Sequence, residues 1–173
     1  MPNLDATLFA GYSVSIAFDL PDTLSHLTYL RNKVRALLAH LDVTRQDIDD
    51  LELIIGELAT NVIRHAQSGT YQVTLTFSEG NVQVQVMDKG RGFSPDTVSE
   101  PGTPRPEELP ELYEAVQVKA ETAEPNERIG GFGLPLVRSL TDQLAITTNT
   151  QPAYGTTIRA TKRLQRPESG KPQ

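Results

Sequence analysis

The chain has 173 residues, a mass of 19.0 kDa and a formal charge of −6. This is the size of one ordinary domain, and a domain of this length buries roughly 70% of its unfolded surface. Hydrophobic residues make up 38% and charged residues 22%, which excludes collagen-like, coiled-coil and wholly disordered classes. The absence of cysteine excludes thiol catalysis, disulfides and thiolate metal sites, and the acidic balance argues against sequence-independent nucleic-acid binding.

The N-terminal stretch 8–18 is the segment to test for membrane targeting. No basic segment precedes it, and Gly11, Ser13 and Ser15 interrupt its apolar run, so it is a poor signal peptide. It is also far too short to span a bilayer. We therefore expect a cytoplasmic protein with no membrane partner.

The first two predicted elements are a strand and a helix. Apolar residues at every second position predict a strand over residues 12–18, which Asp19 and Pro21 should end. Leucine and valine then recur every three or four residues, which predicts a helix over residues 22–40 with one apolar face.

A second helix and a β-hairpin follow in the sequence. Thr44 with Asp47 three residues later is a carboxylate variant of the capping box, and it predicts a helix over residues 44–66. Two alternating segments, 71–77 and 82–86, flank a Glu-Gly-Asn turn and predict the two strands of a hairpin.

The segment of residues 93–129 is acidic and rich in proline. It holds nine acidic and three basic residues, so it carries the whole charge imbalance and the rest of the chain is neutral. The prolines allow only a short helix, near residues 107–120. A connection this long inside a compact domain is typical of a functional lid.

The last elements predicted are a helix and two strands. A glycine-rich turn at residues 130–133 should open a short helix that continues through Leu140. Strands over residues 144–148 and 156–161 then close the domain.

The order of these elements predicts the fold class and the domain limits. Strand, two helices, two strands, lid, helix and two strands suit an α/β (α+β) sandwich, in which helices pack on one face of a mixed, mainly antiparallel sheet. We assign residues 1–11 to a flexible N-terminal arm, residues 12–163 to the domain, and the polar residues 164–173 to a disordered tail.

Three polar residues at spacings of four line one edge of the second predicted helix: Glu57, Asn61 and His65. A carboxylate above an amide can activate a nucleophile or hold Mg²⁺, which needs only one or two protein ligands beside phosphate oxygens. From this spacing alone a solvated helix edge is the favoured interpretation. His65 by itself is interpreted as a helix-end residue that the helix dipole favours.

A first glycine-rich turn, Asp88-x-Gly90-x-Gly92, ends the second strand of the hairpin. Its glycines let the backbone turn sharply near a ligand, and its carboxylate can accept a hydrogen bond from an amine. The turn does not complete a dinucleotide fingerprint, because Pro95 stands where the third glycine would be. A plain turn is the competing interpretation.

A second glycine cluster, Gly130-Gly131-Phe132-Gly133-Leu134, leads straight into a helix. Such a cluster presents free N–H groups and the positive end of a helix dipole, both of which bind phosphate. It is the stronger of the two glycine signals.

Together with Gly155-Thr156-Thr157, these segments follow one another in a recognisable order. In order and approximate interval they resemble the four ATP-binding boxes of the GHKL superfamily, which includes gyrase, Hsp90, histidine kinases and MutL. Within that superfamily the chain looks most similar to the anti-sigma-factor serine kinases. The resemblance covers residues 12–162, including the phrase at residues 47–53 that leads into the first box.

The resemblance implies a Bergerat ATP-binding fold with a role for each box. Glu57 would be the general base and Asn61 would hold Mg²⁺. Asp88 would accept a hydrogen bond from the exocyclic amine of adenine, and Thr156 would support it through water. Residues that shape the base pocket or offer N–H groups to phosphate complete the implied nucleotide-binding set: Gly90, Gly92, Gly130, Gly131, Gly133 and Leu134. Residues 93–129 would be the ATP lid.

The function implied by the resemblance is protein phosphorylation with ATP and Mg²⁺. The substrate would be an anti-sigma factor antagonist protein, a sigma factor would be sequestered, and the chain would form a homodimer. The lid is longer and more acidic than the short lid usual in that family, which bears on the identity of the partner.

Three alternatives remain open from the sequence. The acidic lid also suits a non-catalytic switch that grips a partner when ATP binds. The chain could instead be the detached ATPase domain of a histidine kinase system, although His26 and His40 lie inside its first predicted helix rather than on a separate phospho-acceptor helix. In the plainest alternative, the glycines only form turns and the helix edge is solvated.

Overall fold

The computed structural model describes residues 13–41, 43–66, 68–90, 133–149 and 155–166. These residues form three helices and one sheet of five strands. The expected N-terminal arm, the short helix near residue 107 and the lid lie outside this described part of the chain.

The elements occur in the predicted order. They are β1 (Ser13–Pro21), α2 (Leu24–Leu38), α3 (Arg45–His65), β2 (Thr70–Ser78), β3 (Asn81–Asp88), α5 (Gly133–Leu140), β4 (Gln143–Asn149) and β5 (Gly155–Arg163).

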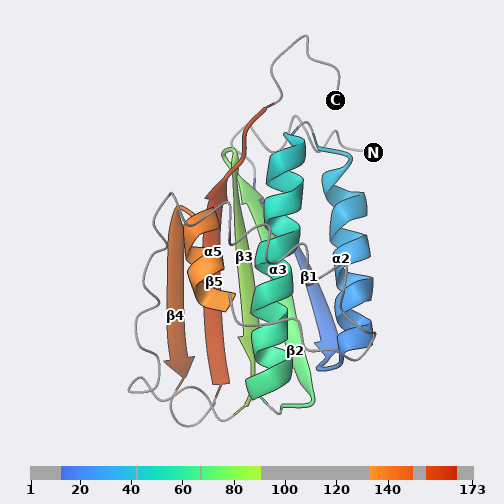
Figure 1. Cartoon of the computed structure of the whole chain (residues 1–173), viewed down its shortest axis with the longest axis vertical. Helices are drawn as coiled ribbons and strands as arrows, with labels where there is room; N and C mark the ends of the chain where they lie inside the picture. The colour runs from blue at the N-terminus through green and yellow to red at the C-terminus, as the bar shows by residue number, and fades with distance from the viewer. Residues whose placement is uncertain (1–12, 42, 67, 91–132, 150–154, 167–173) are drawn as a thin grey trace.

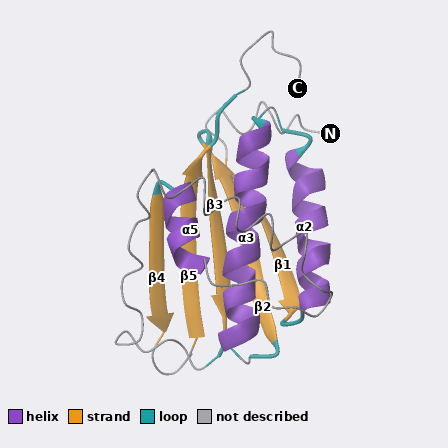
Figure 2. Cartoon of the chain, in the orientation of Figure 1, coloured by secondary structure: helices purple, strands orange, loops and turns teal. Residues whose placement is uncertain are grey.

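The sheet has the strand order β1-β2-β3-β5-β4, and every neighbouring pair is antiparallel. All three helices lie on the same face of this sheet, with α5 near β4 and β5, α3 over the middle and α2 near β1 (Figures 1 and 2). This arrangement confirms the predicted class of a mainly antiparallel sheet with helices on one face. None of the described helices is long and apolar enough to cross a membrane.

The core fills the layer between the helices and the sheet. Strand residues at alternate positions point into it, as the predicted period of two requires, and α3 runs through its centre with Leu51, Ile54, Ile55 and Leu58 almost fully buried. Because α3 is buried along most of its length, the polar residues that it carries are held in fixed positions against the sheet.

The first strand is longer than its sequence predicts. Asp19 does not end β1, which continues to Pro21 and pairs there with Thr70 of β2. The strand lies at the edge of the sheet, where a proline without an N–H group does not interrupt a ladder on both sides.

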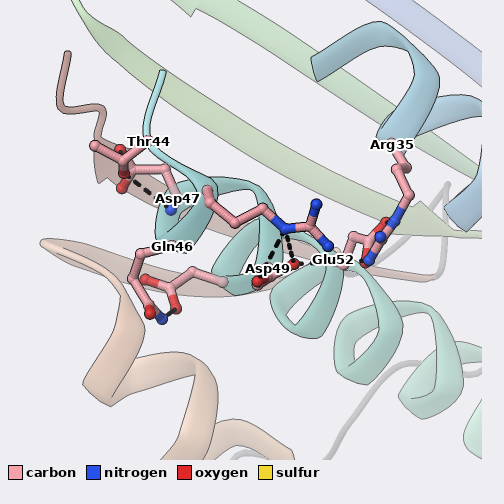
Figure 3. A network of polar contacts seen from close by, with 8 residues as sticks. Arg35, Thr44, Gln46, Asp47, Asp49 and Glu52 are labelled. Carbon is pink, nitrogen blue, oxygen red and sulfur yellow. Dashed lines mark hydrogen bonds and ion pairs between the residues drawn. The ribbon is translucent and has the colours of Figure 1, made fainter. Parts of the chain in front are cut away.

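The start of α3 confirms the predicted cap. The Asp47 N–H donates to Thr44 Oγ1 at 3.2 Å, and the Thr44 hydroxyl donates to Asp47 Oδ2 at 2.8 Å (Figure 3). The same carboxylate oxygen also accepts from the backbone N–H of Gln165 at 2.7 Å. The cap therefore joins the beginning of α3 to the chain that follows β5.

The first residue of the predicted tail is part of the core. Leu164, which we placed in a disordered tail, is 5% exposed and belongs to the core. Its backbone N–H donates to Gly80 O at 2.8 Å, in the turn between β2 and β3. A single leucine in a polar stretch gives little periodic signal, so only the tertiary contacts reveal that it is buried.

Candidate nucleotide-binding site

The edge of α3 predicted from the sequence meets the beginning of α5. Glu57 is buried at 8% exposure, and Asn61 is half-buried one turn later. A backbone hydrogen bond links Gly133, the first residue of α5, to the Glu57 carboxylate. A Cβ placed on Gly133 would lie 3.8 Å from Asn61 Oδ1. The structure thus brings together residues from the first and third predicted boxes.

Two opposing effects act on the Glu57 carboxyl group. Burial raises its pKa above the ordinary value, while the charges of Arg31 and Arg64 and the hydrogen bond from Gly133 lower it. A carboxylate with a raised pKa is a better proton acceptor, provided that it remains ionised near neutral pH. The environment of Glu57 therefore suits a general base.

Asp88 lies at the end of β3 and is buried at 4% exposure. The Gly90 N–H donates to its Oδ1 at 2.7 Å, and the backbone of Thr156 on β5 forms a second hydrogen bond to the carboxylate. Burial raises the pKa of Asp88, and the two backbone hydrogen bonds oppose that rise. A buried carboxylate with a remaining acceptor site can bind an amine.

Two glycines next to Asp88 admit no other residue without a shift of backbone. A Cβ on Gly90 would lie 2.7 Å from the carbonyl carbon of Ala66, the residue that caps α3. Gly155 has a φ of +147°, and a Cβ there would lie 3.0 Å from the carbonyl carbon of Asp88. Backbone from α3, β3 and β5 therefore meets here at glycine-only distances.

The two groups of residues occupy different heights along α3. Asp88 and Gly90 lie by Ala66 at the C-terminal end of the helix, whereas Glu57 lies roughly 14 Å earlier along it, at about 1.5 Å per residue. The two carboxylates are thus well separated along α3, so that an elongated ligand could contact both of them.

The remaining predicted site residues divide into described and undescribed ones. Thr156 is buried at 2% exposure next to Asp88, and Leu134 is half-buried and packs against the core. Three of the predicted glycines lie outside the described residues: Gly92, Gly130 and Gly131.

A divalent cation would find Asn61 as its protein ligand here. No cluster of three or more histidine, aspartate or glutamate side chains that could hold a metal occurs among the described residues. The side-chain amide of Asn61 lies beside the glycine that opens α5, where a Cβ would be 3.8 Å from its Oδ1 and 3.9 Å from its Nδ2. One oxygen ligand is enough for Mg²⁺, which keeps several waters and takes further ligands from phosphate.

Sequence reasoning missed Arg31 and Gly56. Arg31 belongs to α2, and nothing in the sequence indicates which residue of α3 it approaches. Gly56 did carry a signal, because a glycine inside a strong helical pattern is unfavourable and points to a close approach by another group.

The sequence profile of the histidine kinase-like ATPase domain family matches residues 20–162 of the chain. The anti-sigma F factor of Bacillus licheniformis is 27% identical over 143 residues, which cover 80% of this chain and 85% of the relative. The anti-sigma F factor of Bacillus thuringiensis is 25% identical over 142 residues, which cover 79% of this chain and 84% of the relative.

Two solved structures share the fold at lower identity. The RsbU and RsbW domains of Rv1364c from Mycobacterium tuberculosis match with a TM-score of 0.58 and 21% identity, over 89% of this chain. This chain spans 33% of that longer protein. The SiaB-SiaC complex from Pseudomonas aeruginosa matches with a TM-score of 0.55 and 17% identity, over 84% of this chain and 88% of the matched chain.

Proposed function

The chain belongs to the family of histidine kinase-like ATPase domains, and on that premise we propose that it is an ATP- and Mg²⁺-dependent serine/threonine protein kinase that regulates a sigma factor. ATP is the nucleotide of the family, and the finer assignment depends on the site. The observation that carries it is Glu57, a buried carboxylate that forms a hydrogen bond with the backbone of Gly133, the first residue of α5, and whose pKa is lowered by the charges of two arginines.

Glu57 has the surroundings that phosphoryl transfer to a hydroxyl needs. The carboxylate would accept the proton of a serine or threonine hydroxyl while the hydroxyl oxygen forms a bond to the γ-phosphorus of ATP. The bond from the γ-phosphorus to the bridging oxygen breaks, and ADP leaves with the electron pair. Because little covalent chemistry falls to the protein, positioning and charge supply most of the catalysis.

The other residues would bind the nucleotide. Asp88 would accept a hydrogen bond from the exocyclic amine of adenine, with Thr156 beside it. Asn61 would hold Mg²⁺, which would supply positive charge to offset that of the phosphates. Gly133 would offer phosphate the positive end of α5, together with the predicted glycines of residues 130–131.

The partners are proposed from the relatives. Two relatives that the chain matches over most of their length are named anti-sigma F factors. We therefore assign the chain an anti-sigma factor antagonist as phosphorylation substrate and a sigma factor as the protein that it sequesters. A cytoplasmic location and a homodimer complete the proposal.

The test is transfer of radioactive phosphate from [γ-³²P]ATP to protein in a desalted extract of the source organism. We expect one small protein to be labelled on serine or threonine, and we expect Glu57→Gln to abolish the label while ATP binding is retained. Glu52→Gln is the matched control, because it makes the same change on the same helix at a residue that pairs with Arg35 instead.

Two results would overturn the kinase assignment. Labelling that persists in Glu57→Gln would show that another group is the base. ATP-dependent capture of a partner without any phosphoprotein, in wild type and Glu57→Gln alike, would select the non-catalytic switch that the acidic segment at residues 93–129 suggested.

A further inference from the structure

Two arginines of α2 face α3 one helical turn apart. Arg35 donates from Nε and Nη2 to the carboxylate of Glu52, and its Nη2 also lies 3.6 Å from Asp49 Oδ1 (Figure 3). Arg31, one turn earlier on α2, meets α3 at Gly56, one turn after Glu52. Arg35 therefore meets a carboxylate on α3, whereas Arg31 meets a glycine.

Gly56 provides the space in which the Arg31 side chain lies. A Cβ on Gly56 would come within 2.9 Å of Cζ and Nε of Arg31, closer than real Cβ atoms come to other atoms. Glycine in a helix interior is unfavourable relative to alanine, and Gly56 lies well inside a helix of 21 residues. The position therefore has a structural reason, which is to admit the guanidinium.

The residue after Gly56 is Glu57, the proposed base. The charges of Arg31 on α2 and of Arg64 on α3 itself both lower the pKa of its carboxyl group, and the backbone of Gly133 at the start of α5 forms a hydrogen bond to it. Of the two arginines, Arg31 has the larger effect in opposing the rise of pKa that burial causes. Arg31 acts from an exposed position on a neighbouring helix, so it can be replaced without disturbing the core.

We propose that Arg31 is a positioning residue for phosphoryl transfer: its guanidinium, which lies against Gly56, holds the carboxylate of the next residue, Glu57, in the orientation in which it accepts the proton. This inference rests on the proposed function, because Arg31 acts only through Glu57. Arginine suits the role, since its guanidinium stays charged and its planar fork has a rigid geometry.

The experiment uses ATP hydrolysis, in which water replaces the protein hydroxyl and no partner is needed. The steady-state kcat, the KM for ATP and the thermal unfolding midpoint are measured with Mg²⁺ for wild type, Arg31→Gln, Arg31→Lys and Gly56→Ala. Lys33→Gln is the control, because it removes a cation from the same helix at a residue that lies over Tyr29.

We expect Arg31→Gln to lower kcat about tenfold and to leave KM within about twofold, a fraction of the 10²- to 10⁴-fold that a general base contributes. Arg31→Lys should keep part of the activity, because it retains the charge without the fork. The acid limb of the kcat profile should move to higher pH in Arg31→Gln, since the pKa of Glu57 rises further when the cation is removed.

Gly56→Ala is an independent test of the packing of Arg31 against Gly56. Alanine favours the helix and its Cβ displaces only the flexible end of Arg31, so the unfolding midpoint should equal or exceed that of wild type. We nevertheless expect kcat to fall about as far as in Arg31→Gln. The double variant should be no worse than either single variant, because both changes remove the same interaction.

Several outcomes would overturn the proposal. One is an unchanged kcat in Arg31→Gln, and another is a raised KM with normal kcat, which would make Arg31 a nucleotide-binding residue. A wild type that binds ATP but neither hydrolyses it nor labels protein would overturn the proposed function instead. In that case ¹³C NMR of the Glu57 carboxyl group still decides: a higher pKa in Arg31→Gln supports the proposal, and an unchanged pKa overturns it.

Discussion

Lys162 of β5 forms an ion pair with Asp50 near the beginning of α3, with 2.9 Å between Lys162 Nζ and Asp50 Oδ2. Lys162 Nζ also lies 3.4 Å from Oδ1 of Asp47, and both aspartates are at most 5% exposed. One lysine thus serves two buried carboxylates at the N-terminal end of the helix that carries Glu57. The helix dipole favours negative charge at that end.

Lys162→Met should destabilise the protein by about 3 kcal/mol, because it removes a cation that pairs with two buried carboxylates. The free energy of unfolding in urea measures this change, and Lys33→Met, at an exposed lysine, should stay within about 0.5 kcal/mol of wild type. An equal loss in both variants would contradict the prediction.

The pH dependence of the same contact has a definite sign. Burial alone would lower the pKa of Lys162, but its hydrogen bond and charge interaction with Asp50 and Asp47 raise it overall above 10.5. The stabilisation of the fold by protonated Lys162 is therefore complete below pH 10.5 and is lost as pH rises through the higher folded-state pKa. Wild type and Lys162→Met should accordingly converge in stability only at strongly alkaline pH.

Gly90→Ala should remove ATP binding and destabilise the fold by about 1–3 kcal/mol, the usual range for overpacking. The added Cβ would meet backbone of Ala66, which cannot rotate away as a side chain can. Gly69→Ala is the matched control: Gly69 has a φ of +77° but no atom of the described residues lies within 4 Å of its Cβ position, so only backbone strain is introduced. Calorimetric titration of ATP should show that this control binds normally, and failure of both variants would point to loss of folding.

Much of this fold follows from periodicity in the sequence, and the exceptions are contacts between distant segments. The cap at Thr44 and the apolar face of α3 are local patterns, so they were predicted correctly. The extension of β1 to Pro21 depends on its place at the edge of the sheet, and the burial of Leu164 depends on the turn that it reaches. Neither the edge position of β1 nor the contact of Leu164 with that turn can be predicted from the neighbouring sequence.

The candidate site divides in the same way. Glu57 with Asn61, and Asp88 with Gly90, are neighbours in sequence, so motif reasoning could find each pair. The approach of Arg31 to Gly56 depends on how α2 and α3 are aligned, which no spacing within either helix reveals. The sequence gives one indication of this contact, the glycine in the interior of α3.

Asp88→Asn should weaken ATP binding by about 10- to 100-fold, the effect of losing a hydrogen bond to a charged group. The oxygen of the asparagine side chain can still accept a hydrogen bond from the Gly90 N–H. Its NH₂ group, however, replaces the second carboxylate oxygen, so the amine of adenine would meet a donor instead of an acceptor. Titration calorimetry with and without Mg²⁺ measures the loss. Wild-type affinity in the variant would remove Asp88 from the nucleotide site.

The same variant should be at least as stable as wild type near neutral pH. Because burial raises the pKa of Asp88 above 3.8, the folded state binds the proton more tightly than the unfolded state. Ionised Asp88 therefore reduces stability once pH exceeds its folded-state pKa, and the reduction disappears as pH falls below 3.8. Urea unfolding at neutral and acid pH should show the advantage of Asp88→Asn at neutral pH only.

Tyr71→Phe should leave stability unchanged or raise it by about 1 kcal/mol, because the tyrosine hydroxyl is buried without a hydrogen-bond partner among the described residues. Tyr71 is 3% exposed, and burial, with a smaller effect from the charge of Asp22, raises its pKa to about 12. The unfolded chain ionises near pH 10.0, so wild type should lose stability between pH 10.0 and about 12, where Tyr71→Phe should lose less. Urea unfolding across that range measures the difference. A marked loss of stability in Tyr71→Phe at neutral pH would show that the hydroxyl does form a stabilising bond, for example through an ordered water.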